Sequence, residues 1–213
     1  NNASPIESVV TLTGSGASDA DPLLLKSLRI EPRGEVGISL GVVGDWNLVQ
    51  TVSYIRFEDV QVVGTLNQSH IENERCLDLE LNKSVAHLTV VNSGFSQCDH
   101  GWYFNKHNGT ITPSTAQYIT VSNSSFIDNS YKGIYVELLS DAVFDGVIVS
   151  GNGLIANWNG AFNAGVDINL KAGTYQNLVF RNMTVIGNGL GAQHGAGLLI
   201  KARDDGGTYG ANP

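Results

Sequence analysis

The chain has 213 residues and a formal net charge of −8 at pH 7, and only 15% of its residues are charged. So low a charged fraction disfavours coiled coils and helical bundles, and the acidic balance disfavours nucleic acid as a partner because no positive field would hold a phosphate backbone. The 25 glycines, with many Asn, Ser, Thr and Val residues, favour short strands joined by tight turns. Apolar stretches fall far short of the roughly 20 residues that cross a bilayer, so we expect no membrane insertion.

A glycine followed by alternating apolar residues recurs along the chain. After an early copy at residues 10–12, the pattern returns at residues 37–40, 76–81, 101–105, 133–138, 165–170 and 197–201. Each copy precedes a second alternating run, a polar or glycine turn residue and a third short run. The turn residues are Asp59, Asn92, Asn123, Gly146 and Asn182. Three short strands per repeat predict an all-β fold, a right-handed parallel β-helix with three sheets and about six coils. We expect residues 1–213 to form a single β-helix domain. The same repeat pattern is also compatible with a fragment of a longer solenoid.

The coil pattern, as in Gly-Ile-Tyr-Val at 133–136 and Val-Ile-Val-Ser-Gly-Asn at 147–152, resembles the pectate-lyase-like superfamily of right-handed β-helices. This superfamily includes polysaccharide lyases, alginate epimerases and adhesin stalks, and the resemblance covers nearly the whole chain. It implies the fold and a groove for extended sugar chains. The hydrolase and epimerase signatures are not present as sets: His194-Gly195 and Asp204-Asp205 echo the hydrolase fragments in the wrong order. The resemblance therefore assigns no catalytic residue.

Long insertions flank the strands of the first sheet and predict a groove over its outer face. They cover residues 41–53, 65–75, 106–117, 153–164 and 189–196. Period-2 alternation turns the apolar residues inward and leaves two outward columns. The first column is Ser39, Asp78, Tyr103, Tyr135, Asp167 and Leu199, and the second is Glu80, Asn105, Glu137, Asn169 and Lys201. We expect the acids, amides and tyrosines to bind sugar, with Trp46 and Trp158 as stacking platforms on opposite walls.

Glu137 and Asp167 would lie about 8 Å apart across neighbouring strands, a spacing that suits an inverting glycosidase, although Asp78 with Glu80 would satisfy it equally well. A lyase or epimerase would need cations and a base, for which the candidates are Lys201, Arg203, Lys132, His100 and His107. The catalytic candidates are thus Glu137, Asp167 and Lys201. Because the carboxylates are expected to face solvent, alanine at Glu137 or Asp167 should change stability by only about 0.5 kcal/mol.

No cofactor is assigned from the sequence. An acidic groove floor would repel a polyuronate unless Ca²⁺ bridged the two, so Ca²⁺ is the one ion that the pattern favours, and no residue is assigned as a metal ligand.

Cys76 and Cys98 are expected to form a disulfide. Cys98 lies three residues before Gly101, which is the position equivalent to Cys76 one coil later. This places the two cysteines within the roughly 4.4–6.8 Å Cα separation that a bridge demands.

Two function classes stay open. The leading hypothesis is a secreted or cell-surface β-helix that binds polysaccharide over its first sheet, with or without cleavage or epimerisation; a start at Asn1 without a methionine fits export. The alternative is a non-catalytic adhesin stalk or self-assembling fibre module whose polar face is only solvated. An open last coil with apolar Leu198 and Ile200 also favours end-to-end self-association.

Overall fold

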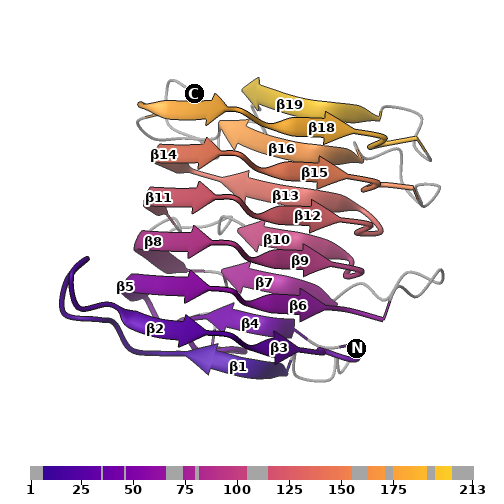
Figure 1. The fold of residues 1–213 in the computed structure, drawn as a ribbon. Coiled ribbons are helices and arrows are strands. Elements are labelled where there is room, and N and C mark those ends of the chain that lie inside the picture. Colours follow the sequence, from indigo (N-terminus) through magenta and orange to yellow (C-terminus); the bar gives the residue numbers. More distant parts are fainter. Residues whose placement is uncertain are drawn as a thin grey trace.

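A computed structural model shows three parallel sheets stacked as a β-solenoid (Figure 1). It describes residues 7–34, 36–45, 47–65, 74–79, 82–104, 115–154, 163–170, 175–190 and 195–202. These residues form strands and turns, and they include no helix long and apolar enough to cross a membrane. The predicted all-β class and three-sheet solenoid are confirmed.

The chain passes through the three sheets in turn, so each sheet collects every third strand. The first sheet has seven strands: β1 (Ser8–Leu12), β4 (Val36–Leu40), β7 (Arg75–Leu79), β10 (His100–Phe104), β13 (Lys132–Glu137), β16 (Ala164–Leu170) and β19 (Ala196–Ala202). The second has six: β2 (Leu23–Lys26), β5 (Gln50–Glu58), β8 (Lys83–Val91), β11 (Ala116–Ser122), β14 (Leu139–Asp145) and β17 (Leu178–Arg181). The third also has six: β3 (Arg29–Ile30), β6 (Gln61–Val63), β9 (Gly94–Ser96), β12 (Ser125–Ile127), β15 (Ile148–Ser150) and β18 (Thr184–Ile186).

Strict register stacks like positions of successive coils and builds one continuous core. In the first sheet Leu77, Trp102 and Ile134 are register partners, and all three are fully buried. Trp102 stacks on Phe104 and meets Phe95 of the third sheet edge-on. Full burial of such side chains contributes roughly 1.5–3 kcal/mol each, so the apolar half of the alternation holds the coils together.

The turn residues named from the sequence occupy one corner of the solenoid in the left-handed backbone region. Asp59, Asn92, Asn123, Gly146 and Asn182 all have φ between 48° and 65°. Asn, Asp and Gly adopt this conformation at the least cost, which explains why this corner could be recognised in the sequence.

A second corner joins the third sheet to the first and carries a ladder of buried amides. The Nδ2 of Asn129 donates to Asn152 Oδ1, and the Nδ2 of Asn152 donates to Asn188 Oδ1, each at 2.8 Å. A glycine of the first sheet makes room for each amide, since a Cβ at Gly101 would lie 3.1 Å from Asn129 Nδ2 and one at Gly133 would lie 3.0 Å from Asn152 Nδ2.

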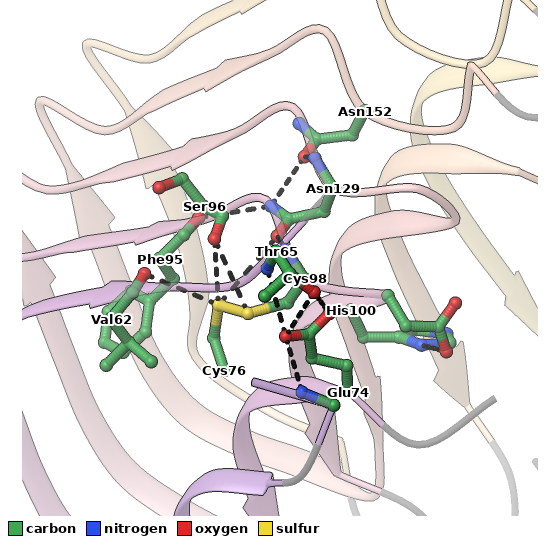
Figure 2. The surroundings of a disulfide bond; sticks show 12 residues. Val62, Thr65, Glu74, Cys76, Phe95, Ser96, Cys98, His100, Asn129 and Asn152 are labelled. Atoms are coloured by element: carbon green, nitrogen blue, oxygen red, sulfur yellow. Dashed lines mark hydrogen bonds and ion pairs between the residues drawn. A yellow bond between two sulfur atoms is a disulfide. The ribbon is translucent and has the colours of Figure 1, made fainter. Parts of the chain in front are cut away.

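The disulfide takes the place of one glycine–asparagine pair. Cys76 stands where later coils have the glycine, Cys98 stands where they have the asparagine, and the two are bonded with their Cα atoms 5.7 Å apart. Figure 2 shows the bridge beside the ladder, where the backbone N–H of Cys98 donates to Asn129 Oδ1 at 3.1 Å. The disulfide therefore occupies the position in its coil that the buried asparagines occupy in the following coils.

Candidate functional site

The two outward columns of the first sheet are aligned as the alternation predicts. Asp78, Tyr103, Tyr135 and Asp167 are register partners in β7, β10, β13 and β16. Glu137, Asn169 and Lys201 form the second column in β13, β16 and β19. The other proposed ligand contacts, Glu80, Asn105, Trp46 and Trp158, lie outside the described residues, as do most of the insertions expected to wall a groove and the candidates His107 and Arg203.

A third column of basic residues lies beside the first two. Arg75, His100 and Lys132 are register partners, and each stands immediately before the residue at the glycine position of its strand. Their side chains reach the outward tyrosines: Arg75 Cζ is 3.8 Å from the Tyr103 ring centroid, and Lys132 Nζ is 4.2 Å from that of Tyr135. His100 and Lys132 were candidates in the sequence, whereas Arg75 was missed. A basic residue directly before the glycine position is the signal that could have found it.

The expectation that the carboxylates of this face are solvent-facing is wrong. Asp78, Glu137 and Asp167 are only 1%, 3% and 0% exposed. Neighbouring strands of a sheet are about 4.8 Å apart, so long side chains on adjacent strands cover one another. Arg75 and Lys132 lie across the tyrosine rings in this way. The small effect of alanine substitution at Glu137 or Asp167 that solvent exposure implied therefore no longer follows.

The N-terminal part of this face contains one ion pair and one contact between an imidazole and a carboxylate. Arg75 Nη1 lies 2.8 Å from Asp78 Oδ1, and His100 Nδ1 lies 2.9 Å from Asp99 Oδ2. The His100 ring also packs against Tyr103, with centroids 4.8 Å apart. A carboxylate on Nδ1 fixes the orientation of the imidazole.

The C-terminal part is centred on Asp167. Lys132 Nζ lies 2.6 Å from Asp167 Oδ2, and Lys201 Nζ lies 3.0 Å from both oxygens of the same carboxylate. The hydroxyl of Tyr135 donates a short hydrogen bond to Glu137. Two ammonium groups thus counterbalance one buried carboxylate, and the second carboxylate is held by a phenol. We call the whole set the outer-face cluster: Arg75, Asp78, Asp99, His100, Tyr103, Lys132, Tyr135, Glu137, Asp167, Asn169 and Lys201.

Burial shifts the titration of several groups in the cluster. It raises the pKa of Asp78 against the opposing effect of Arg75, and it lowers the pKa values of His100 and Lys132 against the opposing effects of their carboxylate partners. It also raises the pKa of Tyr103 to about 12 and that of Tyr135 further, because Glu137 adds to the effect of burial there. Both phenols therefore stay protonated at neutral pH, and the His100 imidazole is favoured in its neutral form.

Asn169 is a fully buried member of the cluster whose amide is unsatisfied. Its side chain is 0% exposed, and neither Oδ1 nor Nδ2 has a hydrogen-bond partner among the described residues. It stands between Glu137 and Lys201 in register. Leaving a buried amide unpaired costs about 1–3 kcal/mol, so this residue needs a reason other than the stability of the coil.

The outer face of the second sheet offers a contrast. There Arg181 and Asp145 also form a cross-strand ion pair, with Nη2 and Oδ2 2.9 Å apart, but their side chains are 61% and 32% exposed. Thr120 on the same face is exposed. Buried ionisable side chains thus gather on the first sheet's outer face, although Lys83 at the start of β8 is also fully buried.

The described residues contain no group of three or more His, Cys, Asp or Glu side chains that could hold a metal ion. The cluster is instead built of ion pairs and phenol–carboxylate contacts.

Fold and site together define a parallel β-solenoid with a buried ionisable cluster on one outer face. Comparisons with the profiles of known protein families, with curated protein sequences and with solved structures give no significant match.

Proposed function

We propose that this protein is an extracellular β-helix of the pectate-lyase-like superfamily that binds a polysaccharide along the outer face of its first sheet and acts on it by acid–base chemistry. The burial of the outer-face cluster carries the proposal. Removing charged groups from water costs several kcal/mol per ion, and a coil that served only as a spacer would gain nothing from it. Perturbed, desolvated groups gathered at one place are typical of functional sites.

The chemistry and the layout of the cluster favour a sugar polymer. Carboxylates and amides pair with hydroxyl groups, and tyrosine rings pack against the C–H faces of sugars. Tyr103 and Tyr135 are stacked with ring centroids 5.3 Å apart, and the columns run from β7 to β19 along the solenoid axis. An extended ligand could therefore contact consecutive coils.

Hydrolysis is the reaction that the carboxylates support best. Glu137 and Asp167 stand one strand and two residues apart, which corresponds to about 8 Å, within the range of an inverting glycosidase. We assign Glu137 as the general acid that protonates the leaving oxygen while the glycosidic C–O bond breaks. Asp167 is then the base that takes a proton from the attacking water. In this proposal Lys201 and Lys132 hold Asp167 and act as positioning residues, and the direct catalytic role of Lys201 considered from the sequence stays a prediction.

Product analysis tests the proposal. The protein is incubated with plant, algal and bacterial polysaccharides, with and without Ca²⁺, and new reducing ends and the absorbance of unsaturated uronates are measured. Reducing ends without unsaturated products support hydrolysis, and their loss in Glu137→Gln assigns them to this site. Unsaturated products would replace hydrolysis with elimination. If the protein neither binds nor converts any of these polysaccharides, the result favours the non-catalytic function described next.

The alternative is a non-catalytic stalk or self-assembling fibre module, and one observation favours it. Leu198 and Ile200 of β19 are register partners of the buried core residues Val166 and Ile168, yet they are 45% and 47% exposed. Among the described strands β19 has a neighbour on one side only, and apolar side chains beside such an edge favour association with further strands.

A further inference from the structure

The basic side chains of the outer-face cluster are already paired with carboxylates of the same cluster. Arg75 pairs with Asp78 at 2.8 Å, and Lys132 and Lys201 pair with Asp167 at 2.6 and 3.0 Å. An anionic sugar would have to compete with these buried pairs, whose replacement would leave a carboxylate uncompensated.

The cluster also has no excess of cations. Among its described members the cations Arg75, Lys132 and Lys201 face the carboxyl groups Asp78, Asp99, Glu137 and Asp167, and burial disfavours the charged forms of both His100 and Asp78. The chain as a whole has a net charge of −8. The described part of the cluster therefore offers a polyanion no surplus of positive charge, and the net charge of the whole chain opposes its approach.

The unsatisfied amide of Asn169 indicates what the ligand offers instead. Its buried Oδ1 needs a donor and its Nδ2 needs an acceptor, and the described part of the chain supplies neither. A hydroxyl group is donor and acceptor at once, whereas a carboxylate is only an acceptor. A sugar hydroxyl or a pair of vicinal hydroxyls would satisfy both amide atoms.

We infer that the outer-face cluster takes a neutral, hydroxyl-bearing glycan and excludes uronate-rich or sulfated polymers. The inference rests on the proposed polysaccharide binding and adds the charge class of the substrate. The internal pairing of the basic residues supports the exclusion of anions, and the buried, unsatisfied amide beside Glu137 supports the recognition of hydroxyl groups.

Matched pairs of polymers test the inference. Galactomannan, xyloglucan and mixed-linkage β-glucan are each used in native form and after oxidation of C6 to the carboxylate. Binding is measured by affinity electrophoresis and calorimetry in the presence of a chelator, so that Ca²⁺ cannot bridge the charges. We expect at least one native polymer to bind and its oxidised form to bind at least about tenfold more weakly. Equal or tighter binding of the oxidised form would overturn the inference while leaving polysaccharide binding intact. Absence of binding to every polymer, charged or neutral, would overturn both.

Salt dependence and two variants separate charge exclusion from a poor fit. Discrimination against the oxidised polymer should shrink as NaCl concentration rises, because the repulsion is screened. Asn169→Ala should weaken binding of the native polymer by at least about tenfold, whereas Thr120→Ala on the second sheet should leave it unchanged. Discrimination that persists unchanged in high salt would contradict the electrostatic argument, and native-like binding by Asn169→Ala would contradict hydroxyl recognition by the buried amide.

Discussion

Lys132 and Asp167 form a buried ion pair across adjacent strands of the first sheet, with Nζ and Oδ2 2.6 Å apart. Their side chains are 10% and 0% exposed, and Lys201 closes the arrangement from the next strand at 3.0 Å. Asp167 is therefore the shared counter-ion of two lysines, and its side chain is buried. Because Asp167 is buried and paired, its replacement by alanine should strongly destabilise the protein, whereas a solvent-facing carboxylate would have been replaced at little cost.

Asp167→Ala should destabilise the protein by about 3–5 kcal/mol, because it removes the carboxylate that two largely buried ammonium groups share. The free energy of unfolding in urea measures the effect. Asp145→Ala is the matched control, since its partner Arg181 is exposed and solvated in both states. We expect little change in that variant. If Asp167→Ala unfolds at the same urea concentration as Asp145→Ala, the ion-pair network contributes nothing to stability and Asp167 is a wetted surface residue.

The disulfide and the amide ladder should be interchangeable at one coil. Removing the bridge as Cys76→Ser/Cys98→Ser should cost roughly 3 kcal/mol, mainly because the unfolded chain regains conformational freedom. The double variant Cys76→Gly/Cys98→Asn recreates the glycine–asparagine pair of the following coils, so the introduced amide could donate to Asn129 Oδ1. It should recover part of the loss in thermal or urea unfolding.

Two outcomes would contradict the claim that the disulfide takes the place of a glycine–asparagine pair. Titration of two free thiols in the denatured, unreduced protein would exclude the bridge. Equal stability of the glycine–asparagine and double-serine variants would show that the ladder does not extend to this coil.

His100 should make folding stability depend on pH just below neutrality. Burial lowers its pKa from the ordinary value of 6.5, so below that value the unfolded chain binds the proton more readily than the folded protein does. The resulting stability is present above pH 6.5 and is lost as the pH falls through the lowered value. Asp78, whose pKa is raised by burial, acts in the opposite direction, so variants have to be compared.

Urea unfolding at several pH values from slightly alkaline to mildly acidic measures this dependence. His100→Gln should flatten the fall in stability relative to the parent, while His87→Gln on the second sheet controls for the loss of an imidazole as such. An unchanged pH dependence in His100→Gln would show that His100 does not titrate differently in the folded and unfolded states.

The columns of the site could be predicted from the sequence because period-2 alternation and a constant repeat determine the register. Tyr135 and Asp167 stand beside each other for the same reason that Ile134 and Val166 do. Arg75 could not be found in this way. The alternation is interrupted at the glycine position of each strand. In β10, for example, His100 directly precedes Gly101 and Tyr103 follows it by two residues, yet both side chains lie on the outer face and contact each other.

The burial of the side chains on the outer face could not be predicted from the sequence, for a different reason. Alternation states which way Glu137 and Asp167 point, but their exposure depends on how Lys132, Tyr135 and Lys201 lie across them. Those contacts are set by side-chain conformations and not by spacing. The amide ladder was equally hidden, because its asparagines differ from those of the turn column only in their partner glycines.

The apolar end of the solenoid should promote self-association of this chain. Leu198 and Ile200 are half exposed although their register partners are buried. The molar mass from light scattering should therefore rise with protein concentration, and Ile200→Glu should reduce this rise by placing a charge in the contact. A monomer at high concentration in the parent protein would mean that this end is covered within the chain.

The most direct test of the central claim compares Glu137→Gln with the parent protein on a polysaccharide that the parent cleaves or binds. The substitution preserves size and the ability to accept the Tyr135 hydrogen bond, so the melting temperature should change little. We predict that reducing-end formation falls by at least about a hundredfold if Glu137 is the general acid, a loss within the range of general acid–base catalysis. Unchanged turnover and unchanged binding in a folded Glu137→Gln protein would contradict the account, and the outer-face cluster would then be an element of solenoid structure alone.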